Sequence, residues 1–484
     1  MKKIEFFLLL IILGAFIVRL YKFNNPIGDW HSWRQADTSA VSRNFIKFGF
    51  DILHPRFDDL SKTPSGGIDN PQGYRFVEFP IYNIAQAGLY KFFGYFTIEQ
   101  WGRIVTILSS ILSIIFVFLI VKKYINASAG IFAAFFLAFL PYNIYYSRTI
   151  LPDPLASMGI LGGIYFFDKW IERPKFSIFN FQFLLALVFT SGALLAKPFV
   201  VFFALPFIYL VLSKFGLSFF KKWQLWFFLI FISSPLIFWR IWIQQYPGAI
   251  PMSSWLFNGN HIRFKGAFFQ WIFAQRIPNL ILGYWGLPIV ILGIISKIKN
   301  RDLFLFSFLL SSLLYLFTVA TGNVQHDYYQ ILIIPTLAIF FARGIDFLIR
   351  HSNDLLNKKI TYLFIVLSTA FMLMFGWYSV RDYYNINHPE VIKAGRIIDK
   401  VLPKDAKVIA VYGGDTTFLY YVNRQGWPVF DRQIEDFIKS GAGYVAFINP
   451  GKEELDFANH FQTTAKDPHY AVYDLNKPLN ISKK

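Results

Sequence analysis

The sequence predicts a polytopic α-helical membrane protein, and three observations carry that prediction. Of the 484 residues, 55% are hydrophobic and 20% are aromatic, which exceeds the usual apolar share of soluble chains. The apolar residues come in long blocks that basic residues often flank, as in membrane spans with positive inner loops. The net charge of +18 is therefore a topology signal, and we expect no nucleic-acid partner. The chain has no cysteine, which excludes disulfides and thiolate metal sites.

The first apolar segment, residues 1–21, opens with two lysines and lacks a small-x-small cleavage site, so we expect a retained span with a cytoplasmic N-terminus. The polar loop at residues 24–80 is then external. Within it, residues 38–48 carry apolar side chains at helical spacing and predict a short surface helix. Residues 80–93 are apolar but short for a span and predict a second surface helix.

Apolar length and basic inner loops predict about 11 transmembrane helices in all. After the first, we expect spans at residues 98–121, 127–145, 155–167, 181–195, 199–212, 225–242, 280–295, 304–320, 329–348 and 360–378. After Arg381 the composition becomes mixed and polar, and strand-like and helix-like segments alternate. We therefore expect a transmembrane domain at residues 1–382 and a small extracytoplasmic α/β domain at residues 383–484. The location is a cell (inner or plasma) membrane.

Under this topology four polar segments fall on the outer face: the first loop, SRTILPDP, the tip at Lys197 and GNVQHDYY. An interfacial active site requires such loops to converge, and topology alone does not show that they meet. Asp29 and Asp37, in the first loop, can each accept a proton from an acceptor hydroxyl or amine. Asp153 lies between two prolines, where a rigid turn can aim its carboxylate. The alternative for Asp37 and Asp153 is helix capping. For the whole loop, the alternative is that its charges only keep it in water.

Three cations, Arg34, Arg148 and Lys197, stand at the outer ends of spans and can hold a phosphate leaving group. Their alternative role is to snorkel to lipid headgroups. The candidate metal ligands are His31, Glu78, His261 and His326. No two of them stand at a diagnostic local spacing, so a divalent metal stays open and no cofactor is certain.

Five segments, in this order along the chain, resemble the GT-C superfamily of membrane glycosyltransferases. They are D-x-HSWRQADT, EFPIY, SRTILPDP, LLAKP and HDYYQILIIP. The most similar members are the polyprenyl-phosphate-sugar-dependent transferases, which include protein O-mannosyltransferases and the aminoarabinose transferases of lipid A. The resemblance covers roughly the first 350 residues.

The resemblance implies a GT-C fold and a glycosyltransferase that moves a sugar from a polyprenyl-phosphate donor to an extracytoplasmic lipid, glycan or protein. An acidic residue of the first loop is the base, with Asp29 the first choice and Asp37 the second. Asp153 matches a further acidic point near the site. The implied substrate-binding residues are His31, Arg34, Glu78, Arg148, Lys197, His326, Tyr328 and Tyr329. The family's adjacent Asp-Glu pair is absent, since Asp29 is followed by Trp30, so the choice between the two aspartates stays open.

Two other functional classes remain. A membrane transporter or flippase of a lipid-linked or small polar substrate usually carries charges within its spans. Here the charges lie at span ends and in outer loops, which favours interfacial chemistry. The other class is an assembly protein whose outer domain binds a partner.

Overall fold

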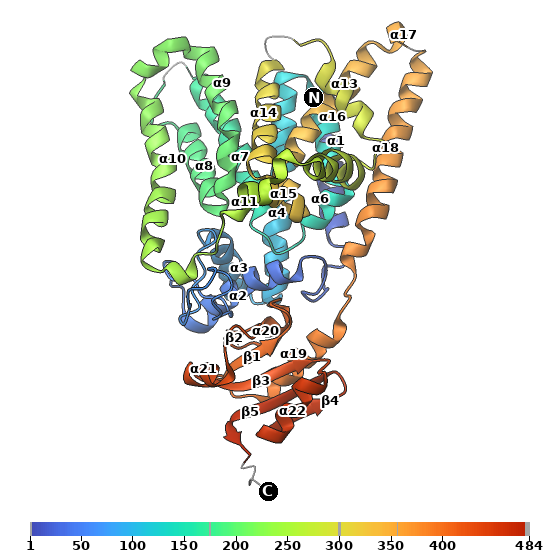
Figure 1. The fold of residues 1–484 in the computed structure, drawn as a ribbon. Coiled ribbons are helices and arrows are strands. Elements are labelled where there is room, and N and C mark those ends of the chain that lie inside the picture. Colours follow the sequence, from blue (N-terminus) through green and yellow to red (C-terminus); the bar gives the residue numbers. More distant parts are fainter. Residues whose placement is uncertain (1, 174–175, 299–301, 356, 480–484) are drawn as a thin grey trace. The chain divides into compact units, whose positions relative to one another are not determined.

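The computed structural model describes residues 2–173, 176–298, 302–355 and 357–479 (Figure 1). The chain divides into two compact units. The helical unit comprises residues 1–23, 103–240 and 253–383. The loop–sheet unit comprises residues 24–102, 241–252 and 384–484.

The helical unit is built almost entirely of helices. They are α1 (Lys2–Arg19), α4 (Ile98–Tyr124, from Arg103 onward), α5 (Ala127–Phe139), α6 (Pro141–Tyr146), α7 (Asp153–Ile171), α8 (Phe181–Ala196), η1 (Pro198–Phe203), α9 (Ala204–Phe215), η2 (Gly216–Lys221), α10 (Trp223–Trp242), α11 (Trp255–Asn258), η5 (Gly259–Phe264), α12 (Gly266–Phe269), η6 (Gln270–Ile281), α13 (Leu287–Ile295), α14 (Leu303–Thr318), α15 (Ala320–Gln325), η8 (Asp327–Ile333), α16 (Ile334–Arg350), α17 (Ser352–Leu355), α18 (Lys358–Val380) and η9 (Arg381–Tyr384).

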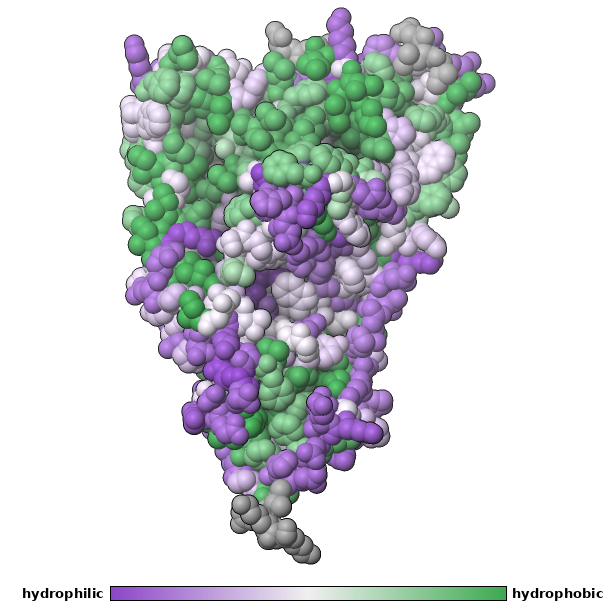
Figure 2. All heavy atoms as spheres, in the orientation of Figure 1, coloured by the Kyte–Doolittle hydropathy of each residue, from purple (hydrophilic) through white to green (hydrophobic). Residues whose placement is uncertain are grey.

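Five helical segments within the described residues are long and apolar enough to cross a membrane. They are Ile98–Tyr124, Pro198–Lys221, Trp223–Gln245, Asp327–Arg350 and Lys358–Val401. Three shorter apolar helices, α5, α8 and α14, accompany them. Apolar side chains of α10 such as Ile230 and Phe238 are exposed, and Figure 2 shows apolar residues gathered over the helices. Such surfaces suit lipid, so the chain is an integral multi-pass membrane protein.

Small residues let these helices approach closely, as is usual between helices in lipid. A Cβ added to Gly163 of α7 would lie 2.2 Å from Thr190 Oγ1 of α8. A Cβ added to Gly293 of α13 would lie 1.9 Å from the carbonyl oxygen of Phe340 in α16. The positions of α7 relative to α8, and of α13 relative to α16, therefore depend on glycine at the contact.

The loop–sheet unit combines the first loop with the C-terminal segment. Its elements are α2 (Ser32–Phe48), α3 (Ile81–Phe93), the first turn of α4, η3 (Ile243–Gln245), η4 (Pro247–Ala249), α19 (Pro389–Val401), β1 (Lys407–Val411), α20 (Thr417–Val422), β2 (Gly426–Trp427), α21 (Ile434–Lys439), β3 (Ala442–Ile448), α22 (Lys452–His460), β4 (Phe461–Asp467) and β5 (Tyr470–Pro478).

A five-stranded mixed sheet with strand order β2-β1-β3-β5-β4 forms the core of this unit. Strand β1 pairs in parallel with β2 and β3, while β5 pairs antiparallel with β3 and β4. Val408 and Ala410 pack with α19 and α20 on one face, and Ile409 packs with Phe437 of α21 on the other. This alternation is the period-2 pattern of a strand buried on both faces. The small C-terminal α/β fold, with the expected β1, β3, α19 and α20, is confirmed.

The first loop is joined to the edge of this sheet. Asp59 forms an isolated parallel bridge with Gly426 of β2. The Gly426 amide donates to the Asp58 carbonyl at 2.9 Å, and the Leu60 amide donates to the Gly426 carbonyl at 2.7 Å. The first loop and residues 384–479 therefore form one compact unit, whereas the expected boundary separated residues 1–382 from 383–484. That division into independent domains stays a prediction.

The two helices expected in the first loop are both present. Helix α3 exposes Phe92 and Phe93 at its C-terminal end, as a surface helix requires. Helix α2 differs from the expected surface helix, because 11 of its 17 residues are buried. Its buried residues are mostly polar, and they are paired with groups of the loop and of α20. Helix α2 is thus an interior helix of its unit.

Asp59, at the joint between loop and sheet, is a buried carboxylic acid. Its Oδ1 accepts a hydrogen bond from the Ser61 amide at 2.7 Å, and the residue is 4% exposed. Burial, together with a smaller contribution from the charge of neighbouring Asp37, raises the pKa of Asp59 from an ordinary value near 3.8 to about 7. The Asp59 proton therefore belongs to the folded state near neutral pH.

The joint at Gly426 gives the first prediction. Gly426→Ala places a Cβ 1.8 Å from the Val408 carbonyl oxygen, so β2 must shift away from β1. We expect a loss of about 1–3 kcal/mol in the free energy of unfolding, measured by thermal unfolding in nanodiscs. Gly443→Ala in β3 is the control, because the nearest atom to its added Cβ is the Asn476 side-chain nitrogen at 3.1 Å. Equal unfolding temperatures for both variants would contradict the close packing of β2 against β1 at Gly426 as a source of stability.

The second prediction concerns pH. Because the folded-state pKa of Asp59 is raised, its contribution to stability is present below about pH 4 and is lost as the pH rises through about 7. Asp59→Asn keeps an acceptor for the Ser61 amide but removes this titration. We expect the variant to gain on the order of 1–4 kcal/mol over wild type at pH 8 and little at pH 4. A pH-independent difference in unfolding temperature between the two proteins would refute the assignment.

Candidate active site

Helix α2 begins earlier than the sequence predicted. His31 has left-handed backbone angles (φ 57°, ψ 39°) and is the N-cap residue, so the helix starts at Ser32. Asp37 then lies inside the helix, on its second turn. The capping role considered for Asp37 is therefore excluded.

Asp29 precedes α2 and is held by its first turn. The Gln35 side-chain amide donates to Asp29 Oδ1 at 2.7 Å, and it also lies 3.3 Å from the Trp30 carbonyl oxygen. Asp29 and Gln35 are both buried. The Gln35 amide therefore orients the Asp29 carboxylate at the start of α2.

Arg34 and Glu78, from the two ends of the first loop, form an ion pair. Arg34 Nη2 lies 2.7 Å from Glu78 Oε1, and both side chains are largely buried. Arg34 therefore does not have the exposure that snorkelling requires. The ring of His31 packs on Trp30, with ring centroids 5.1 Å apart.

Asp37 has two strong partners. Arg75 Nη2 lies 2.7 Å from its Oδ2, and the Thr416 hydroxyl, from the residue preceding α20, donates to its Oδ1 at 2.7 Å. Both carboxylate oxygens of Asp37 are therefore engaged by strong donors. Burial also raises the pKa of nearby Asp415, and the 2.7 Å hydrogen bond from the Thr417 backbone amide to Asp415 Oδ1 opposes that shift.

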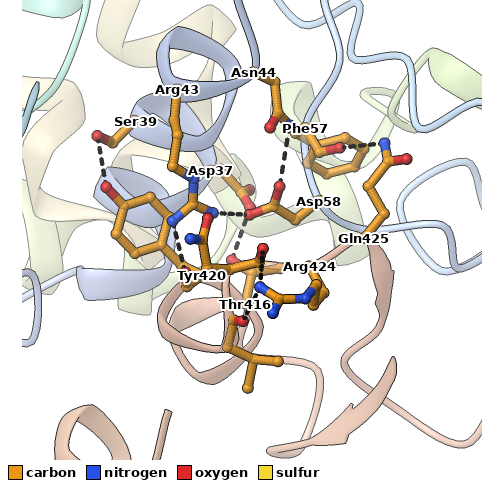
Figure 3. A network of polar contacts seen from close by, with 12 residues as sticks. Asp37, Ser39, Arg43, Asn44, Phe57, Asp58, Thr416, Tyr420, Arg424 and Gln425 are labelled. Carbon is orange, nitrogen blue, oxygen red and sulfur yellow. Dashed lines mark hydrogen bonds and ion pairs between the residues drawn. The ribbon is translucent and has the colours of Figure 1, made fainter. Parts of the chain in front are cut away.

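A second polar cluster lies further along α2 (Figure 3). Arg43 pairs with Asp58 and donates to the Tyr420 carbonyl at 2.7 Å, and its guanidinium lies 4.0 Å from the centroid of the Tyr420 ring. Asn44 donates to Asp58 Oδ1 at 3.0 Å. Burial raises the pKa of the Tyr420 hydroxyl well above its ordinary value, and Glu99 raises it further, so Tyr420 remains a donor.

In the helical unit, Asp153 and Lys197 form a buried ion pair. Asp153 is the first residue of α7, and its carboxylate makes no capping hydrogen bond. Its Oδ1 lies 3.1 Å from Lys197 Nζ, which follows the end of α8, and both side chains are at most 5% exposed. The alternative capping role considered for Asp153 is therefore excluded, and burial excludes snorkelling by Lys197.

Aromatic rings surround the ammonium group of Lys197. Its Nζ lies 5.0, 5.8 and 5.9 Å from the ring centroids of Tyr329, Tyr328 and Phe199. The His326 ring stacks on those of Tyr328 and Tyr329, with centroids 5.5 and 6.0 Å apart. The structure thus brings four of the predicted residues of this unit together with Asp153. Such a site holds a cation in place and suits an anionic ligand.

Asp327 anchors the segment that supplies these rings. It is 1% exposed and accepts hydrogen bonds from the Tyr146 and Tyr383 hydroxyls, each at 2.5 Å, while Arg276 Nη1 lies 3.5 Å from its Oδ2. The Tyr142 hydroxyl donates to its backbone carbonyl. Asp327 therefore fixes η8.

Arg148, the remaining predicted cation, is fully buried. One of its guanidinium nitrogens donates to the Lys22 carbonyl at 3.3 Å, and the group lies 5.3 Å from the centroid of the Tyr145 ring. It therefore supports the junction that follows α1, and its burial does not suit snorkelling.

An apolar cavity of about 650 Å³ lies among α7, α8, α9 and α10. Pro198 and Val200, which immediately follow the Lys197 ion pair in sequence, belong to its lining. The remaining wall consists almost wholly of aliphatic and phenyl side chains. The cavity therefore suits a hydrocarbon chain.

Metal binding stays open. In the part of the chain that the structure describes, no three His, Asp or Glu side chains gather in a way that could hold an ion. The predicted candidates are divided between the units, with His31 and Glu78 in one and His261 and His326 in the other.

Sequence reasoning missed several residues of these clusters. Gln35, Arg75 and Thr416 carry no local signal, because their partners are distant in sequence or ordinary in type. For Asp327, by contrast, the sequence did give an indication. Asp327 lies within the HDYYQILIIP segment already identified, where an acidic residue stands beside a run of tyrosines and aliphatic residues.

The chain is similar to known membrane glycosyltransferases. Residues 78–239 match the family model described as dolichyl-phosphate-mannose-protein mannosyltransferase. Compared by sequence with curated proteins, the chain has no significant match.

Solved structures share the fold at low sequence identity. The crystal structure of ArnT from Cupriavidus metallidurans bound to undecaprenyl phosphate matches with a TM-score of 0.65 and 14% identity, covering 96% of this chain and 97% of that one. The Archaeoglobus fulgidus oligosaccharyltransferase tethered with an acceptor peptide matches with a TM-score of 0.58 and 10% identity, covering 92% and 69%. The same organism's AglB, in complex with an inhibitory peptide and a dolichol-phosphate, matches with a TM-score of 0.53 and 11% identity, covering 92% and 69%.

Because these matches cover 96% and 92% of this chain, they include both the helical membrane part and the C-terminal mixed sheet. They bear out the GT-C resemblance drawn from the five sequence segments. Residues 78–239 therefore resemble the dolichyl-phosphate-mannose-protein mannosyltransferase family, and the chain as a whole shares its fold with the ArnT structure.

Proposed function

We propose that this protein transfers a sugar from a polyprenyl-phosphate donor to an extracytoplasmic lipid, glycan or protein, with inversion at the anomeric carbon. The observation that carries the proposal is Lys197, a buried ammonium group held by Asp153 and by aromatic rings. A fixed cation of this kind stabilises a phosphate leaving group as its negative charge develops. The lipids named for two similar solved structures, undecaprenyl phosphate and dolichol-phosphate, carry the phosphate headgroup that such a leaving group has.

The proposed reaction is a direct displacement. The acceptor oxygen or nitrogen forms a bond to the anomeric carbon while the bond from that carbon to the phosphate oxygen breaks. The acceptor proton passes to a carboxylate, and the polyprenyl phosphate leaves with both electrons of the broken bond. Lys197 binds the departing phosphate, and Tyr328 and Tyr329 hold Lys197 in place.

We assign the base to Asp29. Both oxygens of Asp37 are engaged, because Oδ2 pairs with Arg75 at 2.7 Å and Oδ1 accepts from Thr416 at 2.7 Å. Asp29 precedes α2, and the Gln35 amide donates to its Oδ1 at 2.7 Å and orients it. Asp37 is then a structural residue of α2. Arg34, Glu78 and His31 shape the loop around the base, and Arg148 supports the phosphate side.

The apolar cavity among α7 to α10 supports a lipid-linked donor. Pro198, the residue that follows Lys197, is part of the cavity lining. The apolar wall of the cavity suits an isoprenoid chain. In this assignment the membrane delivers the donor already oriented, which lowers the entropic cost of the reaction. The full topology we propose has about 11 spans, a cytoplasmic N-terminus and an extracytoplasmic C-terminal domain.

The third prediction tests the base. Asp29→Asn should lose sugar transfer by roughly a hundredfold or more, because proton acceptance is removed. Asp37→Asn should keep measurable turnover but unfold at a lower temperature, because Arg75 loses its ion pair. The assay is release of polyprenyl phosphate from labelled donors by purified protein in nanodiscs. Asp51→Asn is the control, since this loop carboxylate is exposed.

Either of two results would count against this proposal. If Asp37→Asn is inactive and Asp29→Asn is not, the two aspartates exchange roles. If wild type consumes no donor across a panel of sugars, the transferase function is lost, and uptake into proteoliposomes becomes the next assay because transport is the rival class.

The fourth prediction tests Lys197. Lys197→Met should weaken binding of labelled polyprenyl phosphate at least tenfold, and it should cost about 3–5 kcal/mol of stability because Asp153 is left buried without its counter-ion. Adding Asp153→Asn should restore the unfolding temperature but not binding. Lys214→Met, at an exposed lysine of α9, is the control. Recovery of binding in the double variant would show that Lys197 has only a structural role.

A further inference from the structure

The C-terminal segment contacts helix α2 through two side chains of one helical face. Thr416 precedes α20 and Tyr420 lies four residues later, so both face the same way. The Thr416 hydroxyl donates to Asp37 Oδ1 at 2.7 Å. The Tyr420 hydroxyl lies 3.1 Å from Ser39 Oγ (Figure 3). It also donates to Glu99 Oε1 at 2.5 Å.

We propose that Thr416 and Tyr420 are positioning residues for the transfer reaction: they fix α2, and through Gln35 they fix the base Asp29. The inference rests on the proposed function. It gives the C-terminal α/β segment a part in catalysis through contacts to α2 rather than by touching the substrate.

Thr416 completes the hydrogen bonding of a buried carboxylate. Arg75 occupies Oδ2 of Asp37, and Thr416 occupies Oδ1. Without the hydroxyl, a buried carboxylate oxygen loses a donor, and α2 must turn to find another. Gln35 lies two residues before Asp37 on the same helix. Any turn of α2 therefore moves the Gln35 amide, whose 2.7 Å hydrogen bond orients Asp29.

Tyr420 holds the next turn of the same helix. Its hydroxyl bridges Ser39 to Glu99 at the start of α4, and its ring and carbonyl both contact Arg43. Thr416 binds Asp37, and Tyr420 contacts Ser39 and Arg43. The α20 segment therefore contacts α2 at successive turns. Rotation of α2 about its axis is thus opposed at more than one point.

The chain supplies a matched control at the next residue. Thr417 is also buried, and among the described residues its hydroxyl has no hydrogen-bond partner. Thr416→Val and Thr417→Val therefore make the same change in shape and polarity on the same short helix, but only the first removes a hydrogen bond to α2. Thr416→Ser keeps the hydroxyl and serves as the rescue variant.

The experiment measures kcat and KM for a labelled polyprenyl-phosphate sugar in nanodiscs, together with backbone hydrogen exchange over residues 32–48. We expect Thr416→Val to lower kcat about tenfold with KM nearly unchanged, because orientation of the base is lost while donor binding is kept. Exchange at α2 should rise in the same variant. Thr417→Val and Thr416→Ser should match wild type in both measurements.

A double-mutant cycle identifies the route of the effect. In an Asp37→Asn background, Thr416→Val should change kcat less than twofold, since its partner carboxylate is already gone. Tyr420→Phe is a second, independent variant that removes only a hydroxyl, and it should also lower kcat and loosen the turn at Ser39. It keeps the proposal testable if Thr416→Val fails to fold.

The inference is overturned if Thr416→Val and Tyr420→Phe both keep the wild-type kcat, or if Thr417→Val loses activity equally. Both results require an active wild type, so they leave the proposed function intact. An inactive wild type would overturn the proposed function instead. In that case, unchanged exchange at α2 in Thr416→Val would also remove the structural basis of this inference.

Discussion

The rest of the loop–sheet unit depends on the pairing of buried charges along α2. This helix carries buried Arg34 and Asp37 and half-buried Arg43, and removing the partner of a buried charge costs several kcal/mol. Each partner comes from a different part of the first loop: Glu78, Arg75 and Asp58. The path of the loop is thereby fixed at three points. A polar sequence that could have been a solvated loop becomes ordered because its charges satisfy one another.

The same constraint shapes the helical unit with other groups. Lys197 is buried beside Asp153, which neutralises its charge. Segment η8 keeps its place because Asp327 accepts hydrogen bonds from two hydroxyls and lies near a guanidinium. Groups held this firmly need little reorganisation when charge develops nearby, and such preorganisation is what stabilises a leaving phosphate. The interactions that order the chain are therefore also those that suit it for transfer chemistry.

The sequence predicted the elements that depend on local patterns. Apolar length located the long helices, and alternation located β1 and β3 with the helices beside them. The sequence did not predict that α2 is an interior helix. The polar residues of α2 indicate a solvent-facing helix as long as their buried partners are not known. Thr416 contacts Asp37 across 379 residues of chain, and no local pattern reports such a pair. Helix α2 begins at Ser32, six residues before Thr38. The left-handed backbone of His31, which precedes it, is likewise set by its surroundings.

Two carboxylates eight residues apart, Asp29 and Asp37, are equivalent in sequence but differ in environment. Asp37 is bound by the guanidinium of Arg75 and by the Thr416 hydroxyl. Asp29 accepts a hydrogen bond from the amide of Gln35, which lies in the first turn of α2. In the proposed function Asp29 is the base and Asp37 is a structural residue. Because Gln35 and Asp37 lie on one helix, the contacts that fix Asp37 also limit where Gln35 can orient Asp29.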